Sequence, residues 1–237
     1  MLKKLIKCFI VLSLLLLSIQ KVEAKKVSGF IINENSDTIF GKIKLSKFDI
    51  RTGALLFNGI NLEQMHYGIW FRAIDSRKFK NYKATDISGF GFDYKSQHYI
   101  YHSFIIESNT KVIKDKKQSK FLQLIYGGSI NLYRILERIT NGINGVDASS
   151  DWNRDQSFIY YDYFLYEKTI GLTKVEISDS IRTINQLLIK YDFDSEYIKN
   201  LKSETNLKDI KSVLIDYDLW LKHKKKSTPV RSVASEN

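Results

Sequence analysis

Two apolar runs that meet at a glycine pair constrain the fold of this 237-residue chain most strongly. Residues 121–126 and 129–136 flank Gly127 and Gly128. Only glycine takes the positive φ angles of a tight turn without strain, so we predict a hairpin with this pair at positive φ. The segments before this hairpin have the pattern of short strands, and the segments after Gly171 have the spacing of helices.

This order predicts an α+β fold in which the sheet comes first and the helices follow. We expect an antiparallel β-rich body of hairpins, an open sheet or a small barrel over residues 25–170. About three C-terminal helices over residues 171–224 are expected to pack on that body. Residues 225–237 are rich in basic and small polar side chains, and they predict a disordered tail.

The first strands are predicted within residues 27–45, where two β-branched runs are separated by a turn rich in Asn and Asp. Along the second run, Ile43 and Leu45 share one face, whereas Phe40 and Lys42 share the other. We therefore expect one face of this hairpin to contact a core and the other to face mostly water.

Three later segments have distinctive patterns. Residues 77–83 interleave Lys with aromatics, which is typical of an edge strand protected by Lys. The same pattern is compatible with binding of a polyanion through charge and ring stacking. Gly89 and Gly91 predict a strand with a bulge or a close backbone approach. Residues 97–107 predict a long strand, and residues 111–120 are interpreted as a polar, Lys-rich turn.

The N-terminus predicts export. Lysines precede an apolar run at residues 9–19, and Ala24 closes a small-residue cleavage site, so we expect a signal peptide over residues 1–24. The run is shorter than the roughly 20 residues of a membrane-spanning helix. Cys8 lies at the start of the run, so no lipobox is present. We expect a soluble periplasmic or extracellular protein that is not a lipoprotein and has no transmembrane span in its mature chain.

Composition excludes several kinds of site. Cys8 is the sole cysteine, so the mature chain is predicted to lack disulfides, thiolate metal sites and a cysteine nucleophile. The full chain carries a formal charge of +11. We interpret this charge as a solubilising, Lys-rich surface, and we do not expect a nucleic-acid partner.

Residues 141–156 form the longest irregular stretch, and long loops often carry function. Trp152 lies within it among polar neighbours, so it is the first choice for a binding contact. No cofactor motif is present, and we expect no cofactor.

The same stretch contains a weak calcium-loop pattern. Oxygen-bearing side chains alternate at Asp151, Asn153 and Asp155, and Asp162 occupies the twelfth place. Gln156 replaces the glycine that makes the sharp bend of such loops. We therefore favour a polar turn and predict no metal site, with calcium binding as the alternative.

Two further groups of residues have the spacing of known sites. His98 and His102 are four residues apart, but they fall in a strand pattern without an acidic third ligand, so ordinary strand histidines are favoured. Ser108 and Lys111 match the Ser-x-x-Lys spacing, which is common by chance and has no accompanying motif here.

Several short segments occur in a fixed order: Gly-Phe-Ile-Ile at 29–32, Asp-Ile-Ser-Gly-Phe at 86–90, Phe-Leu-Gln-Leu-Ile-Tyr-Gly at 121–127 and Tyr-Phe-Leu-Tyr at 163–166. This order resembles a group of exported bacterial envelope proteins that begin with a signal peptide and have no assigned activity. The resemblance implies a β-rich body with a helical end, and it carries over no catalytic residue.

The leading functional hypothesis is a non-enzymatic envelope protein. It would bind another envelope protein or polymer through a sheet edge or through residues 141–156. A hydrolase acting on an envelope polymer, with acids that the sequence does not identify, is the first alternative. The second is a basic module that holds anionic glycan or lipid through residues 77–83 and 111–120.

Overall fold

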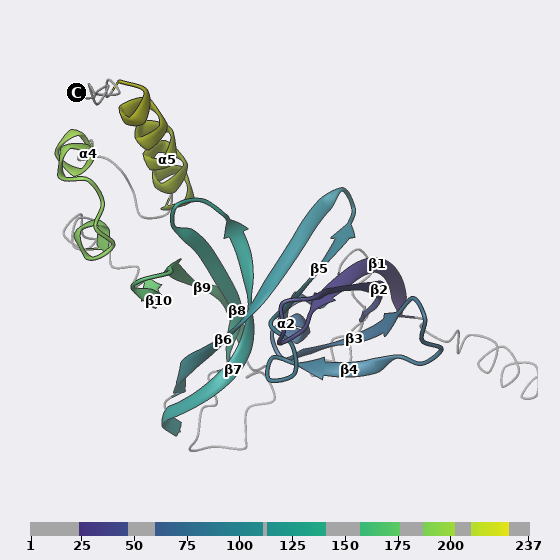
Figure 1. Cartoon of the computed structure of the whole chain (residues 1–237). Coiled ribbons are helices and arrows are strands. Elements are labelled where there is room, and N and C mark those ends of the chain that lie inside the picture. Colours follow the sequence, from purple (N-terminus) through teal and green to yellow (C-terminus); the bar gives the residue numbers. More distant parts are fainter. Residues whose placement is uncertain are drawn as a thin grey trace, which may run out of the picture.

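The computed structural model describes residues 24–46, 60–110, 113–140, 157–175, 187–201 and 210–227. The strands in these ranges form one antiparallel sheet in the order β10-β9-β8-β7-β6-β5-β1-β2-β3-β4 (Figure 1). The predicted antiparallel, β-rich body followed by helices is therefore confirmed. In the described part of the chain, no helix is both long and apolar enough to cross a membrane.

The strands are β1 Lys25–Ile32, β2 Thr38–Leu45, β3 Gly68–Ala73, β4 Lys80–Lys83, β5 Gly89–Tyr94, β6 Gln97–Thr110, β7 Ile113–Tyr126, β8 Asn131–Thr140, β9 Ser157–Glu167 and β10 Gly171–Val175. The helices are α2 Leu62–Met65, α4 Ser195–Asn200 and α5 Ile210–Ser227, and residues 187–190 are also helical.

The β1–β2 hairpin forms as predicted, and its turn depends on Asn33 and Asp37. The Asp37 backbone N–H donates to the Asn33 side-chain oxygen at 2.8 Å, and the Asn33 N–H donates to the Asp37 carbonyl at 3.0 Å. Beyond the turn, burial alternates along β2, with Ile43 and Leu45 buried and Phe40 exposed. The sequence pattern therefore identified the correct inner face.

The β7–β8 hairpin also forms, but the predicted positive φ at its glycine pair is wrong. Among the described residues, Gly171 is the glycine with a positive φ. Gly128 is needed for a different reason, because a Cβ there would lie 2.0 Å from Oδ2 of Asp218 on α5 and 2.7 Å from the ring of Tyr126. The absence of a side chain lets α5 approach the hairpin closely.

The Lys-rich stretch over residues 111–120 was predicted as a turn, and this is wrong for residues 113–120. They belong to β7, which pairs with β6 from Tyr101–Gln123 out to Thr110–Ile113. On this two-stranded arm the apolar Ile105 is 68% exposed although it lies in a strand. The backbone ladder with β6 keeps this polar segment extended.

The predicted helical segment starting at residue 171 is corrected at its beginning. Gly171 begins β10, which pairs with β9 and extends the sheet by one more strand. The turn before it is closed by the Glu167 carboxylate, which accepts from the backbone N–H of Thr169 at 2.7 Å and of Ile170 at 3.0 Å. Five residues that read as the start of a helical region therefore belong to the sheet.

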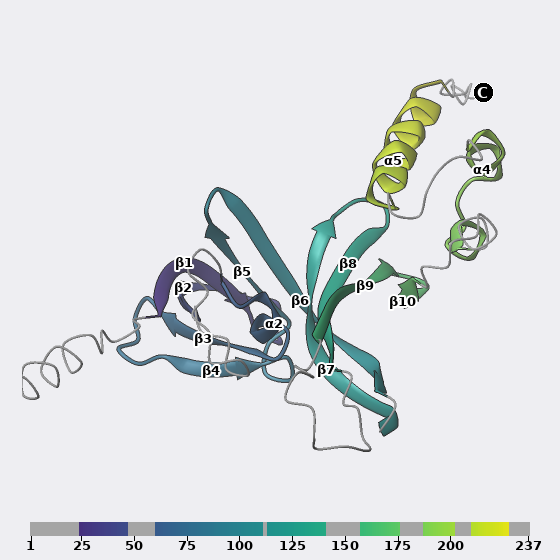
Figure 2. The same cartoon turned by 180° about the vertical axis from the view of Figure 1, so that it is seen from behind.

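The described residues form three hydrophobic clusters, and the two largest lie towards opposite ends of the sheet. Strands β1–β7 and α2 enclose an aromatic core that includes Phe90, Tyr101 and Phe121. Strands β8–β10 pack against α4 and α5 around residues such as Leu132 and Leu214. Figure 2 shows α4 and α5 at one end of the sheet and β1–β4 at the other.

Candidate functional site

A groove crosses the N-terminal end of the sheet, over β1, β2, β3 and the β5–β6 hairpin. Its volume is about 470 Å³, which is within the usual range of small-ligand sites. Because side chains alternate between the two faces of a strand, every second residue of these strands points into the groove. The strand registers arrange the groove-facing residues in two parallel rows.

The first row is polar and runs across five neighbouring strands. Lys42 is paired with Arg72 on one side and with Ser28 on the other, and Asp93 is paired with His98. The β1–β5 register joins these two parts, because Gly29 is the partner of Phe92. In order from β3 to β6, the polar row holds Arg72, Lys42, Ser28, Asp93 and His98.

The second row is apolar and lies one pleat further along the strands. Phe30 is paired with Phe40, and their rings meet edge to face at 6.2 Å between centroids. The Ile74 backbone N–H donates to the Phe40 carbonyl at 3.3 Å, which sets Ile74 beside Phe40. Phe40 is 61% exposed and Ile74 is 77% exposed. The Phe30 ring lies directly over Gly91, and a side chain there would clash with it, because a Cβ at Gly91 would lie 2.5 Å from the ring.

The charges of the groove are separated by strand. Arg72 lies over the Phe79 ring, with its guanidinium carbon 5.1 Å from the ring centroid. Within the described residues, neither Arg72 nor Lys42 has a carboxylate partner. At the other end, Asp93 contacts Nδ1 of His98 at 2.5 Å. The groove is therefore cationic at its β2–β3 end and carries a carboxylate–histidine pair at its β5–β6 end.

This row does not assemble a nucleophile with a base. Asp93 lies between Ser28 and His98, so the hydroxyl and the imidazole are two strand spacings apart, about 10 Å. A serine nucleophile needs a base within hydrogen-bond distance. The arrangement is suited to holding a ligand and lacks the order of a catalytic triad.

The residues predicted for calcium binding are only partly described. Asp162 lies on β9, where its carboxylate accepts from the Lys174 ammonium at 2.6 Å. Lys174 lies on the neighbouring strand β10, so this pair joins two strands. The remaining predicted site residues lie outside the described ranges: Trp152, Asp151, Asn153 and Asp155.

His98 and His102 lie on one face of β6, as the strand pattern predicted, and each has a different partner. His102 shares a hydrogen bond with the Tyr133 hydroxyl at 2.7 Å, and burial lowers the pKa of its imidazole. In the described ranges, no three His, Cys, Asp or Glu side chains are grouped as a metal site would require. Ser108 lies on β6, whereas Lys111 lies outside the described residues.

A buried histidine that the sequence did not single out joins two strands. His66, only 2% exposed, follows α2 and lies between β7 and β8. Its Nε2 accepts from the Leu136 backbone N–H at 3.0 Å, so Nδ1 carries the proton and donates to the Phe121 carbonyl at 2.6 Å. Both ring nitrogens are engaged with backbone, so this histidine is a structural link between the strands.

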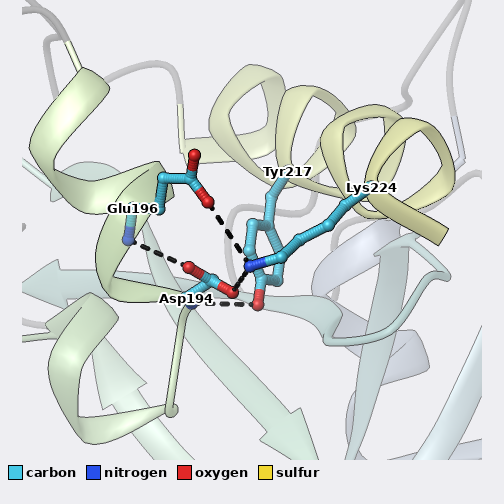
Figure 3. A network of polar contacts seen from close by, with 4 residues as sticks. All are labelled: Asp194, Glu196, Tyr217 and Lys224. Atoms are coloured by element: carbon cyan, nitrogen blue, oxygen red, sulfur yellow. Dashed lines mark hydrogen bonds and ion pairs between the residues drawn. The ribbon is translucent and has the colours of Figure 1, made fainter. Parts of the chain in front are cut away.

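Another polar cluster connects α4 to α5 (Figure 3). Asp194 caps α4 by accepting from the Glu196 backbone N–H at 2.9 Å, and its other oxygen accepts from the Lys224 ammonium at 2.5 Å. The Asp194 backbone N–H donates to the Tyr217 hydroxyl at 3.2 Å. The hydrogen bond from Lys224 is the main cause that lowers the pKa of the Asp194 carboxyl. These groups satisfy one another and hold two helices together.

No protein-family model, curated protein or solved structure matches this chain. The resemblance to exported envelope proteins therefore stays a prediction. The groove is the strongest candidate site. One signal in the sequence points to it: Phe40 alternates with Lys42 on the outward face of a predicted strand. The neighbours of these two residues depend on strand pairings that the sequence pattern did not reveal.

Proposed function

We propose that this chain is a non-enzymatic binding module and that the groove over β1, β2, β3, β5 and β6 is its binding surface. The single observation that carries the proposal is the exposure of Phe40 and Ile74 directly beside Lys42 and Arg72. Apolar side chains gathered in a hollow and bordered by cations are typical of a ligand or partner site, and in the described part of the chain these cations have no carboxylate partner.

The groove is favoured over the sheet edge as the binding surface. The edge strand β4 carries Lys80 and Lys83, which discourage the addition of another strand. The groove instead presents apolar area whose burial would contribute about 25 cal/mol per Å². The loop over residues 141–156 lies outside the described ranges, and its contribution stays part of the hypothesis.

The proposal includes export through a signal peptide over residues 1–24 and a partner that is another component of the envelope, a protein, a polymer or a lipid. It is supported by the start of β1 at Lys25, immediately after the predicted cleavage site. It also includes about three C-terminal helices, for which α4, α5 and helical residues 187–190 provide described segments.

A photo-crosslinking amino acid placed at position 40 tests the proposal. The tagged full-length chain would be irradiated in intact cells, and the captured proteins, lipids and polymers would be identified by mass spectrometry. Position 105 is the matched control, because Ile105 is 68% exposed and lies far from the groove rows on β6. We expect an adduct from position 40 that is absent from position 105.

A second pair of variants separates the groove from the loop. Lys42→Glu is expected to remove the adduct, whereas Lys168→Glu, an exposed charge reversal in the β9–β10 turn, is expected to retain it. Equal capture from positions 40 and 105, or an adduct that persists in Lys42→Glu, would overturn the assignment of the groove. If only deletion of residues 141–156 removed the adduct, the loop would be the binding surface.

A further inference from the structure

We infer that the groove binds a single acyl chain that carries an anionic headgroup, a carboxylate or a phosphate. This inference rests on the proposed function and adds the chemical class of the ligand. It follows from three properties of the groove: the chemistry of the apolar row, the separation of charges along the polar row, and the concave shape.

The apolar row offers a ligand no hydrogen-bonding side chain. Ile74, Phe40 and Phe30 present only hydrocarbon, and the backbone groups beneath them are already used in the sheet ladder. A peptide or a sugar laid on this row would lose hydrogen bonds to water without replacing them, which weakens binding for each polar group that is buried. An acyl chain has no such polar groups, so it is the kind of ligand that this row accommodates best.

The polar row fixes the charge and the direction of the ligand. Lys42 and Arg72 provide two adjacent cations, and an arginine guanidinium can bind a carboxylate or a phosphate through two parallel hydrogen bonds. Asp93 lies two strand spacings from Lys42, about 10 Å away, and would repel an anion. The headgroup is therefore placed at the β2–β3 end, with the chain following the apolar row towards β1.

The shape of the site favours one chain over a membrane surface. The groove is a hollow of about 470 Å³ over the twisted strands. A bilayer surface is flat on this scale and would contact only the rim of the groove. It would not contact Phe30 and would not fill the cavity. A single chain fills the hollow and buries the exposed parts of Phe40 and Ile74.

Calorimetric titration of the full chain with dodecanoate, below the concentration at which it forms micelles, tests the inference. Dodecyltrimethylammonium has the same alkyl chain with the opposite charge and is the matched ligand control. We expect dodecanoate to bind with one chain per protein and dodecyltrimethylammonium to show no saturable binding. The difference comes from Lys42 and Arg72, which attract one headgroup and repel the other.

Matched variants locate the binding. Lys42→Glu should weaken dodecanoate binding at least about tenfold, because it reverses a charge next to the headgroup. Phe40→Ser should weaken it by a similar factor through loss of apolar contact. Lys168→Glu and Ile105→Ser change an exposed charge and an exposed apolar side chain elsewhere, and they should leave the affinity within about twofold.

Several outcomes would overturn this ligand class. Equal binding of both alkyl ligands would remove the anionic headgroup from the inference. Binding of anionic phospholipid vesicles or of heparin, without binding of dodecanoate, would replace the acyl ligand by a membrane surface or an anionic glycan. If dodecanoate failed to bind while position 40 still gave its groove-dependent adduct, the ligand class would fall and the proposed function would stand. If dodecanoate failed to bind and position 40 gave no groove-dependent adduct, both the ligand class and the proposed function would be wrong.

Discussion

The two ends of the sheet use charged side chains in opposite ways. At the helical end the charges bind each other or nearby polar groups: Lys224 contacts Asp194, and Asp218 accepts from Ser129 and Tyr126. At the groove end, in the described part of the chain, Lys42 and Arg72 contact no carboxylate. The first arrangement stabilises the fold, whereas the second leaves charge available for another molecule.

Apolar side chains differ between the two ends in the same way. Leu132, Leu165 and Leu214 are at most 2% exposed in the core between the sheet and the helices. At the other end, Phe40 and Ile74 stay exposed on a face that no described helix covers. The C-terminal end also leaves apolar side chains exposed, such as Ile189 at 65% and Leu219 at 49%. What distinguishes Phe40 and Ile74 is that they lie together in a groove and beside two cations.

The largest expected effect is a difference in the free energy of unfolding between truncations at the two ends. Leu214→Ala removes a side chain that is 2% exposed in the helical core and should lower the free energy of unfolding by about 2–5 kcal/mol. Phe40→Ala removes a larger side chain that is 61% exposed, and it should lower the free energy by only about 1 kcal/mol, mainly because the edge-to-face contact with Phe30 is lost. Urea unfolding followed by circular dichroism measures both. A similar loss in both variants would contradict the view that Phe40 is available for a ligand.

The parts of the fold that the sequence predicted correctly depend on local alternation. In the β1–β2 hairpin, Ile43 and Leu45 alternate with lysines, and the structure buries the two apolar residues. The pattern failed where a distant partner decides the structure. The Lys-rich start of β7 is extended because β6 pairs with it, and Gly128 is required by Asp218, which is 90 residues further along the chain. Neither partner can be read from the neighbouring residues.

A smaller effect is expected from the contact between α5 and the β7–β8 hairpin. The Asp218 carboxylate accepts from the Tyr126 hydroxyl at 2.5 Å and from the Ser129 hydroxyl at 2.5 Å. Burial acts to raise the pKa of this carboxyl, but the hydrogen bonds from Ser129 and Tyr126 outweigh it and hold the pKa below its usual value. Asp218→Asn should therefore cost about 1 kcal/mol near neutral pH, since the carboxylate is partly exposed.

The pH dependence gives the control for Asp218. A carboxyl whose pKa is lowered by folding contributes stability above its unfolded value of about 3.9, and this contribution is lost as the pH falls towards the folded pKa. The wild type should therefore lose more stability than Asp218→Asn between neutral pH and about pH 3. Parallel pH profiles from urea unfolding would show that Asp218 makes no ionised contact with the hairpin.

The two cores differ in whether a buried tyrosine hydroxyl has a hydrogen-bond partner. The Tyr101 hydroxyl, in the N-terminal core, is buried without a hydrogen-bond partner in the described residues. The Tyr191 hydroxyl, in the helical core, donates to the Leu165 carbonyl at 2.9 Å. Tyr101→Phe should raise the free energy of unfolding by about 1 kcal/mol, and Tyr191→Phe should lower it by a similar amount. Changes of the same sign in thermal unfolding would contradict this difference between the cores.

The candidate site was predictable only one strand at a time. Alternation along β2 placed Phe40 and Lys42 on the outward face. Arg72 lies beside Lys42 because β3 pairs with β2. Asp93 lies in the same row because β5 pairs with β1. The second pairing joins strands that are not consecutive in the chain, and no local pattern specifies it.

The smallest expected effect on stability compares the cations of the two ends directly. Lys224→Glu places a carboxylate opposite Asp194 and Glu196, so it should destabilise the chain. Because such exposed pairs are screened by salt, the loss should shrink as sodium chloride is raised towards 1 M, where the Debye length is about 3 Å. Lys42→Glu breaks no ion pair within the described residues and places a carboxylate beside Arg72, so it should not lower the free energy of unfolding at any salt concentration. A salt-dependent loss in Lys42→Glu would mean that this lysine already has an internal partner and is not held for a ligand. A free energy of unfolding no lower than that of the wild type, together with lost ligand binding, would separate binding from folding at this residue.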